Sequence, residues 1–204
     1  VGQGVSGCIV ALAQSQRRAL SDLSVGIQGA GNVGAEVARH LAEYGCRLFV
    51  ADTDRQRAQR VAQEVGAESV DPELLLTSDV DVVSPCATGG VITEQVAAQM
   101  KCWAVCGPAN NELDSLAAAE VMKARGILHV PSVIAGAGAV IHGLCNLSGD
   151  LPPSTQCRAL GHGEKLIIEL GATAARLIEA SQPGRELPET IATRWALARI
   201  NGAR

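Results

Sequence analysis

Gly29, Gly31 and Gly34 have the spacing of a turn that binds the phosphates of a dinucleotide. In such a turn the first glycine makes a tight bend, and the second lets the backbone approach a pyrophosphate. The third lets the following helix pack on the preceding strand. Asn32 and Val33 stand at the start of that helix, where free N–H groups and the positive end of the helix dipole attract phosphate. The stretch therefore predicts a nucleotide-binding turn that includes all five residues.

The residues around this turn support the same interpretation. An apolar run over 23–29 predicts a strand, an amphipathic run over 32–44 predicts a helix, and a second strand over 46–52 ends on Asp52. A carboxylate there accepts hydrogen bonds from the adenosine ribose and repels a 2′-phosphate, so Asp52 with its neighbour Thr53 predicts NAD rather than NADP. The alternative role for Asp52 is to cap the helix predicted over 54–65.

The order of predicted elements indicates the fold class. Strands and helices alternate through residue 130 with short connections, which is typical of an α/β protein with a doubly wound parallel sheet of the Rossmann type. Aromatic residues make up only 2% of the chain, so the core must be built from Val, Ile, Leu and Ala. We expect a single dinucleotide-binding domain over 1–204, with an opening helix over 2–20, a Rossmann core over 21–146 and a helical tail over 154–201.

Two further loops follow predicted strands, at residues 85–90 and 107–112. Ligands of doubly wound sheets bind outside the carboxyl ends of the strands, so we expect these loops and the glycine turn to line one crevice.

Candidate contacts in these loops each have an alternative role. Cys86, Ala87 and Thr88 could contact the nicotinamide half of the cofactor, although their spacing alone favours a plain strand-to-helix turn. The amides of Asn110 and Asn111 could hold a ribose or a carboxamide, or could serve only to make a turn.

Other chemistries find little support in the composition. The net charge of −4 without a basic cluster argues against nucleic acid, and no apolar run is long enough to span a membrane. Seven scattered cysteines lack a metal-binding spacing, and we expect reduced thiols of a cytoplasmic protein without a metal. The three lysines occupy polar stretches, and His142 and His162 fit a core or surface role better than acid–base catalysis. The sequence therefore equips the chain to hold a cofactor and predicts no catalytic residue.

Five stretches also carry a combined pattern, in order along the chain. They are GQGV at 2–5, QGAGNVG at 28–34, PCATGGVI at 85–92, ANNEL at 109–113 and ATRWALARI at 192–200. They resemble the T-G-x-G-V, Q-G-x-G-N-V-G, P-C-A-x-G-x-x-I, A-N-N-Q-L and A-x-R-x-A-x-x-R-I motifs of the glutamate/leucine/phenylalanine/valine dehydrogenase family. The similarity lies in that family's C-terminal cofactor-binding domain and is greater to its leucine and phenylalanine branch.

The resemblance implies an oxidoreductase that deaminates an L-amino acid to a 2-oxo acid and ammonia, with hydride transfer to NAD. It implies that Ala87 and Asn110 contact the nicotinamide ribose and that the active site lies between two domains. The family's N-terminal domain carries a substrate-binding lysine and a catalytic lysine–aspartate pair. We expect that domain to be missing here, and its residues to lie upstream or in another chain.

Two positions depart from the family pattern. Gly136 stands where the family has an Asn that contacts the substrate, and Ser132 stands where Asp is common. A site without such polar partners discriminates substrates differently. Three hypotheses follow: the NAD-binding domain of an amino acid dehydrogenase, a divergent dehydrogenase or imine reductase with another amine substrate, and a stand-alone dinucleotide-binding module without turnover. A small-molecule substrate and a homo-oligomer or separate catalytic domain are the expected partners.

Overall fold

A parallel β-sheet forms the centre of the molecule. The computed structural model describes residues 1–146, 163–181 and 186–202. The strands are β1 (Ser24–Gln28), β2 (Arg47–Ala51), β3 (Glu68–Ser69), β4 (Val82–Pro85), β5 (Ala104–Cys106) and β6 (Leu128–Val130). They form one sheet in the order β3-β2-β1-β4-β5-β6, and every neighbouring pair is parallel. This arrangement confirms the predicted α/β fold with a doubly wound sheet.

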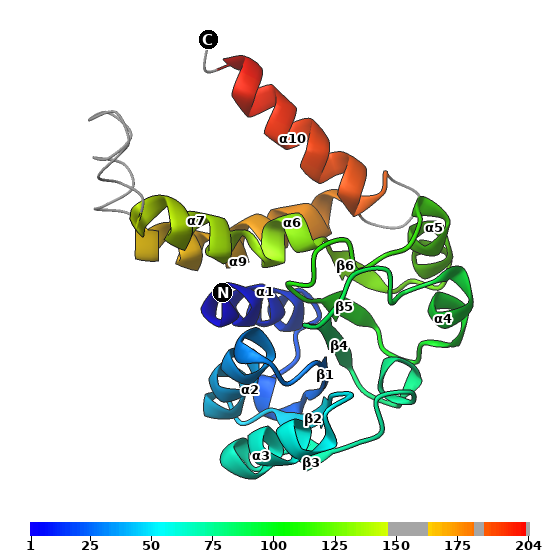
Figure 1. Cartoon of the computed structure of the whole chain (residues 1–204). Helices are drawn as coiled ribbons and strands as arrows, with labels where there is room; N and C mark the ends of the chain where they lie inside the picture. Colours follow the sequence, from blue (N-terminus) through cyan, green and yellow to red (C-terminus); the bar gives the residue numbers. More distant parts are fainter. Residues whose placement is uncertain (147–162, 182–185, 203–204) are drawn as a thin grey trace.

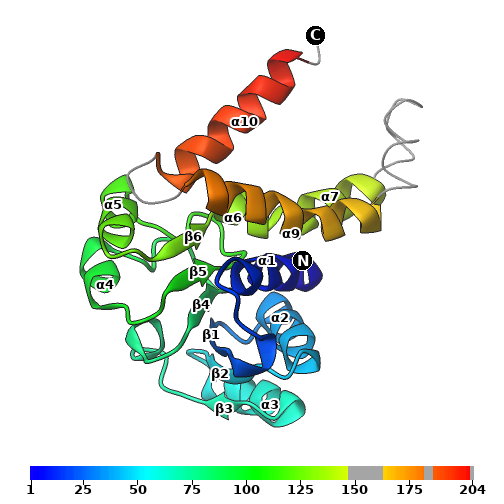
Figure 2. The same cartoon turned by 180° about the vertical axis from the view of Figure 1, so that it is seen from behind.

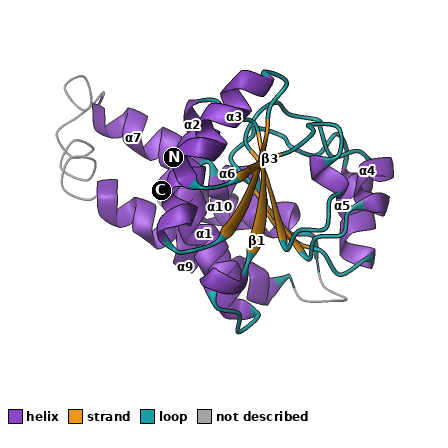
Figure 3. Ribbon diagram, turned by 90° about the horizontal axis from the view of Figure 1, so that it is seen from below, coloured by secondary structure: helices purple, strands orange, loops and turns teal. Residues whose placement is uncertain are grey.

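Helices cover both faces of the sheet, as Figure 3 shows with the strands in the middle. On one face lie α1 (Gly2–Ser15), α2 (Asn32–Glu43), α3 (Arg55–Val65) and α9 (Gly163–Ala180), and on the other lie α4 (Glu94–Gln99) and α5 (Leu116–Ala124). Short 3-10 turns, η1 (Leu20–Asp22) and η2 (Leu75–Thr77), lie between these elements. The last strand leads into α6 (Ser132–Ala135) and α7 (Ala137–Asn146).

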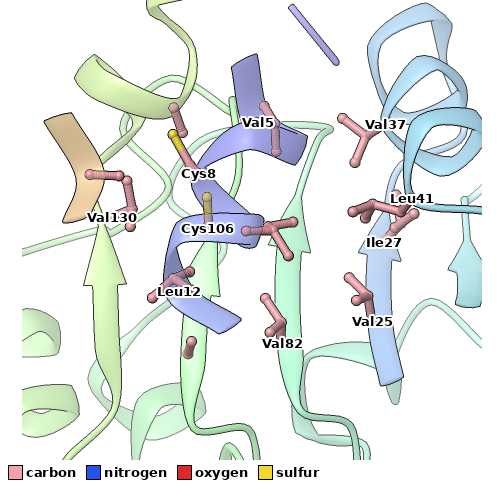
Figure 4. Close-up of a cluster of buried hydrophobic side chains, with 14 of the residues drawn as sticks. Val5, Cys8, Leu12, Val25, Ile27, Val37, Leu41, Val82, Cys106 and Val130 are labelled. Atoms are coloured by element: carbon pink, nitrogen blue, oxygen red, sulfur yellow. The ribbon is translucent and has the colours of Figure 1, made fainter. Parts of the chain in front are cut away.

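The two faces of the sheet have separate cores because successive strand residues point to opposite sides. Val82 packs into the core beneath α1 and α2, whereas the next residue, Val83, packs into the core beneath α4 and α5. Figure 4 shows the first core, where Val5, Cys8 and Leu12 of α1 lie over the strands. Both faces are buried and aliphatic, as the scarcity of aromatic residues predicts.

Helix ends follow local residue chemistry. The side chain of Asp54 accepts a hydrogen bond from the N–H of Arg57 and caps α3, which ends where Gly66 adopts a left-handed φ of 70°. The opening helix is shorter than the predicted 2–20, because α1 ends at Ser15. The residues that follow are exposed and polar, so no apolar face remains to pack, and Arg17 has a φ of 54°.

The tail is helical, as predicted. After α9 the chain forms α10 (Pro188–Gly202), whose first turns are buried at Ile191 and Ala192. Trp195 is half-buried against the first core, and beyond it α10 extends away from the sheet (Figures 1 and 2) and leaves Leu197 and Ile200 exposed. Residues 154–162 of the predicted tail, with His162, lie outside the described residues. Among the described residues, no helix combines the length and apolarity that a membrane crossing requires.

Candidate functional site

The strand order creates a switch point between β1 and β4. These strands are neighbours, yet the chain continues from β1 towards one edge of the sheet and from β4 towards the other. In sheets of this kind ligands bind beside the carboxyl ends of the strands at that point. The glycine turn follows β1 and the loop 85–90 follows β4, so the fold brings two of the predicted loops to this place.

Each glycine of the turn has a distinct steric surrounding. A Cβ atom on Gly34 would lie 1.8 Å from the carbonyl oxygen of Gly29, so helix α2 packs on the turn as closely as glycine allows. Gly29 has a φ of 101°, and a Cβ atom there would lie 2.8 Å from Cβ of Ala87. A Cβ atom on Gly31 would have no atom within 4 Å. The first and third glycines are therefore required by the fold, while the second borders open space.

The N-terminus of α2 faces this open space with unpaired donors. Gly31 is the N-cap residue, has extended backbone angles and offers no side chain to cap the helix. The first helical backbone bond runs from the N–H of Ala35 to the oxygen of Gly31, and within the described residues the N–H groups of Asn32, Val33 and Gly34 have no partner. Such a helix end can bind an anionic group.

Asp52 is held firmly beside the glycine turn. Its Oδ2 atom accepts a hydrogen bond of 2.7 Å from the N–H of Ala30, and its Oδ1 atom accepts one of 2.8 Å from the N–H of Asp54. The hydroxyl of Thr53 donates to Oδ1 at 3.4 Å. The cap of α3 is Asp54, so Asp52 does not have the alternative role of helix cap.

The surroundings of Asp52 keep its carboxylate ionised. The side chain is only 9% exposed, and this burial alone would raise its pKa. The hydrogen bonds from Ala30 and Asp54 and the charge of Arg57, 3.7 Å away, lower the pKa below its usual value instead. The carboxylate is therefore a fixed negative charge at the end of β2, and Arg57 partly offsets it.

A hollow of about 960 Å³ adjoins the turn between α2 and α3. Its lining combines the turn residues Gly31 and Asn32 with charged side chains of the two helices, namely Glu36, Arg39, Arg57, Arg60 and Glu64. Arg39 forms a bidentate ion pair with Glu64, and Arg57 forms ion pairs with both Asp52 and Asp54. The space beside the turn is therefore wide, and most of the charged side chains that line it are paired.

Backbone hydrogen bonds join the loops 85–90 and 107–112. The N–H of Gly90 donates to the oxygen of Asn111 at 2.7 Å, and the N–H of Ala109 donates to the oxygen of Pro85 at 3.1 Å. Asn110 and Asn111 are both exposed, and the left-handed φ of 53° at Asn111 shows that Asn111 serves the turn. Since Gly29 also approaches Ala87, the loop 85–90 contacts both the glycine turn and the loop 107–112.

The loop after β4 presents backbone and small side chains rather than a nucleophile. Ala87 and Thr88 are exposed, and Cys86 is half-buried with its thiol 3.5 Å from the hydroxyl of Ser84. Burial raises the pKa of the Cys86 thiol to about 12, so it remains protonated and unreactive at neutral pH.

A buried ionic cluster near these loops was missed by sequence reasoning. The ring of His129 in β6 bonds through Nε2 to Glu112 Oε1 at 2.7 Å and through Nδ1 to Glu189 Oε1 at 2.5 Å. The only sequence signal is a histidine within an apolar strand. Its partners lie 17 and 60 residues away in the chain, so no local pattern identifies them.

No catalytic group is evident among the described residues. Lys101 and Lys165 are exposed, and Lys123 in α5 pairs with Glu120 at 3.9 Å. The cysteines at 8, 46, 86, 102 and 106 are free thiols, and no group of described His, Cys, Asp and Glu side chains could hold a metal.

A sequence profile of the glutamate/leucine/phenylalanine/valine dehydrogenase family matches residues 49–153, more than half of the chain. The chain belongs to this family. The matched residues include Asp52 and both loops that follow β4 and β5.

Individual relatives agree with this assignment. Leucine dehydrogenase of Bacillus subtilis is 32% identical over 163 residues, which cover 80% of this chain and 43% of that protein. L-tryptophan dehydrogenase of Nostoc punctiforme is 34% identical over 140 residues, 68% of this chain and 39% of that protein. The crystal structure of L-tryptophan dehydrogenase from Nostoc punctiforme matches 98% of this chain and 58% of its own, with a TM-score of 0.87 and 28% identity. This chain therefore spans less than half the length of these two curated relatives.

Gly136, which the family resemblance predicts to stand at the position of a substrate-contacting Asn, lies where backbone atoms approach closely. It follows α6, and a Cβ atom there would lie 2.8 Å from the oxygen of Ser132 and 3.3 Å from the oxygen of Pro108. The N–H of Gly136 donates to the same Ser132 oxygen at 2.7 Å. The close approach gives this chain a steric reason for glycine at a position where the family has an amide.

Proposed function

We propose that this chain is the NAD-binding domain of an amino acid dehydrogenase, a single domain over residues 1–204. The reaction would be oxidative deamination of an L-amino acid to a 2-oxo acid and ammonia, with hydride transfer to NAD. The observation that carries the proposal is the glycine turn: two glycines are packed against backbone, while Gly31 borders open space at the unpaired N-terminus of α2.

The residues at the switch point suit the parts of a dinucleotide. The turn from Gly29 to Gly34, with Asn32 and Val33, would hold the pyrophosphate on backbone N–H groups. The carboxylate of Asp52 would accept hydrogen bonds from the adenosine ribose, and the hydroxyl of Thr53 would donate one to it. NAD itself supplies the hydride acceptor.

The nicotinamide half of the cofactor would lie against the loops 85–90 and 107–112. Ala87 and Thr88 would contribute exposed backbone, with Cys86 beneath them, and Asn110 would contribute an exposed amide that can bond a ribose hydroxyl. Because these loops are tied to each other and to the glycine turn, the two halves of the cofactor would be held in one fixed geometry.

The charge of Asp52 supports NAD over NADP. Its low pKa and its two backbone hydrogen bonds keep a negative charge where the 2′-phosphate of NADP would lie. The ion pair with Arg57 partly offsets that charge. NADP should therefore still bind, but more weakly than NAD.

The acid–base and substrate-binding groups would come from outside the described residues. None of the three lysines lies at the switch point, so the substrate-binding lysine and the catalytic pair would belong to a separate catalytic domain or to a different chain. Gly136 lies in the region where the family contacts substrate, and its lack of an amide would change which amino acid or related amine is accepted.

The direct test is a calorimetric titration with NAD and NADP, followed by a panel of L-amino acids and cyclic imines monitored by NADH absorbance. Binding of NAD with turnover of an amino acid would support the proposal. Turnover of a cyclic imine alone would favour a divergent imine reductase. NAD binding without any turnover is the result expected both of a binding module and of this domain separated from its catalytic domain. Failure to bind either dinucleotide would rule out all three.

A further inference from the structure

The ring of His129 lies between two carboxylates in the interior of the molecule. Its side chain is 4% exposed and that of Glu112 is 3% exposed, while Glu189 in the first turn of α10 is 21% exposed. Both ring nitrogens approach a carboxylate oxygen, and a histidine can donate from both nitrogens only as the imidazolium ion. The geometry therefore fits a positive ring between two negative groups.

Glu112 connects this ring to the candidate cofactor loops. Its Oε1 atom also accepts a hydrogen bond of 3.1 Å from the N–H of Ser132, which begins α6. The backbone oxygen of Glu112 accepts from the N–H of Ile92 at 3.0 Å, and the oxygen of Asn111 accepts from Gly90. One buried carboxylate thus fixes the loop that carries Asn110, and through that loop the end of the loop 85–90.

We propose that protonated His129, held by Glu189, positions the loop 107–112 through Glu112 and so keeps Asn110 in place for the cofactor. Loss of the ring proton leaves only one donor for two carboxylates. When that donor serves Glu189, Glu112 retains only its hydrogen bond from Ser132 and holds the loop less firmly. This inference rests on the proposed binding of NAD and makes His129, Glu112 and Glu189 positioning residues rather than catalytic ones.

The charged groups around the ring agree with this role. On the face of β6 that carries His129, α5 contributes Lys123, which pairs with Glu120, and the loop contributes Glu112. Burial alone would lower the pKa of His129, but the two carboxylates raise it to about 9. The thiol of Cys106 lies near Glu112, and its pKa is raised by the neighbouring thiol of Cys8 and by burial, so it stays neutral.

The experiment is a fluorescence titration of the chain with NADH at a series of pH values from about 7 to about 10. In the unmodified chain we expect affinity to be constant near neutral pH and to fall at least about threefold as His129 loses its proton. Circular dichroism at each pH shows whether the chain remains folded. A constant affinity across the range in folded protein would overturn the inference while leaving NAD binding intact.

Two variants separate positioning from a general structural role. E189Q removes one of the two negative charges that favour the imidazolium, so the fall in affinity should move to lower pH. E112Q supplies an amide that can accept from Ser132 and can either accept from or donate to the ring, so its affinity should no longer depend on pH.

A uniform loss of affinity at every pH in both variants would contradict positioning by the ring proton. NMR titration of the His129 ring signals gives a second readout, because the midpoint should be lower in E189Q than in the unmodified chain. If none of the three proteins binds NADH at any pH, the proposed function itself fails.

Discussion

The Oδ2 atom of Asp52 accepts a hydrogen bond of 2.7 Å from the backbone N–H of Ala30. Ala30 lies inside the glycine turn, between Gly29 and Gly31, so the carboxylate at the end of β2 is tied to the turn at the end of β1. The group proposed to select the ribose and the group proposed to hold the pyrophosphate are therefore one rigid unit. Their separation is fixed before a cofactor arrives.

Substitution of Asp52 by Asn should lower the preference for NAD. Asn keeps an oxygen that can accept from Ala30, but it removes the charge that repels a 2′-phosphate. We expect the ratio of NADP to NAD dissociation constants to fall by about tenfold, ~1.4 kcal/mol, in calorimetric titrations. The control is Asp54→Asn, which changes the same charge at the helix cap and should leave the ratio unaltered. Equal ratios in the two variants would show that Asp52 only braces the turn.

Gly31 and Gly34 should respond to alanine in different ways. Gly31→Ala places its methyl group in open space with compatible backbone angles, but alanine is a poorer N-cap than glycine, so the net change in stability should stay below about 1 kcal/mol. The same methyl group would obstruct a pyrophosphate, and NAD affinity should fall about tenfold or more. Gly34→Ala drives its methyl group into the oxygen of Gly29 and should cost roughly 3 kcal/mol of stability.

Urea unfolding and calorimetry on both variants check this pair. Normal NAD affinity in folded Gly31→Ala would mean that the open space beside Gly31 does not receive the cofactor.

Local patterns sufficed to predict the fold class and the positions of β1 and β2. The aliphatic runs and the glycine triad each act over a few residues, so each can be recognised without tertiary contacts. The proximity of the three loops was also predictable, because the carboxyl ends of parallel strands share one edge of a sheet. The opening helix is shorter than the predicted 2–20. The polar residues after Ser15 can form a helix, but they have no apolar face that packs against the rest of the molecule.

Long-range polar contacts were beyond sequence reasoning. Asp81 accepts hydrogen bonds from Ser24, Trp103 and Arg18, and His129 joins Glu112 to Glu189, yet these partners are separated by 17 to 63 residues. The steric cause of glycine at 136 was equally hidden, since it lies in the approach of two backbone segments. Such features depend on packing, which the periodicity of one segment does not encode.

Stability should fall on the alkaline side because of His129. Its pKa is raised from 6.5 to about 9 on folding, so its contribution is fully present below about pH 6.5 and is lost as pH rises through 9. We expect a loss of at most about 3 kcal/mol in the free energy of unfolding, measured by urea titration at each pH. His129→Gln should remove this slope below about pH 9, where the buried thiols do not yet contribute. An identical slope in the variant would assign the effect to other groups.

Gly136→Asn should destabilise the domain rather than simply restore a substrate contact. The new Cβ atom would lie 2.8 Å from the oxygen of Ser132, which requires a backbone shift that costs about 1–3 kcal/mol. Gly143→Asn is the matched control in α7, because a Cβ atom there meets no atom within 4 Å. Differential scanning calorimetry should give a lower melting temperature for the first variant only. Similar melting temperatures for both would show that residue 136 has room for an amide.

The proposed function is tested most directly by calorimetric titration of the unmodified chain with NAD and NADP under the same conditions. We expect saturable binding of NAD at one site and clearly weaker binding of NADP, because Asp52 remains charged beside an open glycine turn. Absence of binding by both dinucleotides to the folded chain would contradict the proposed function.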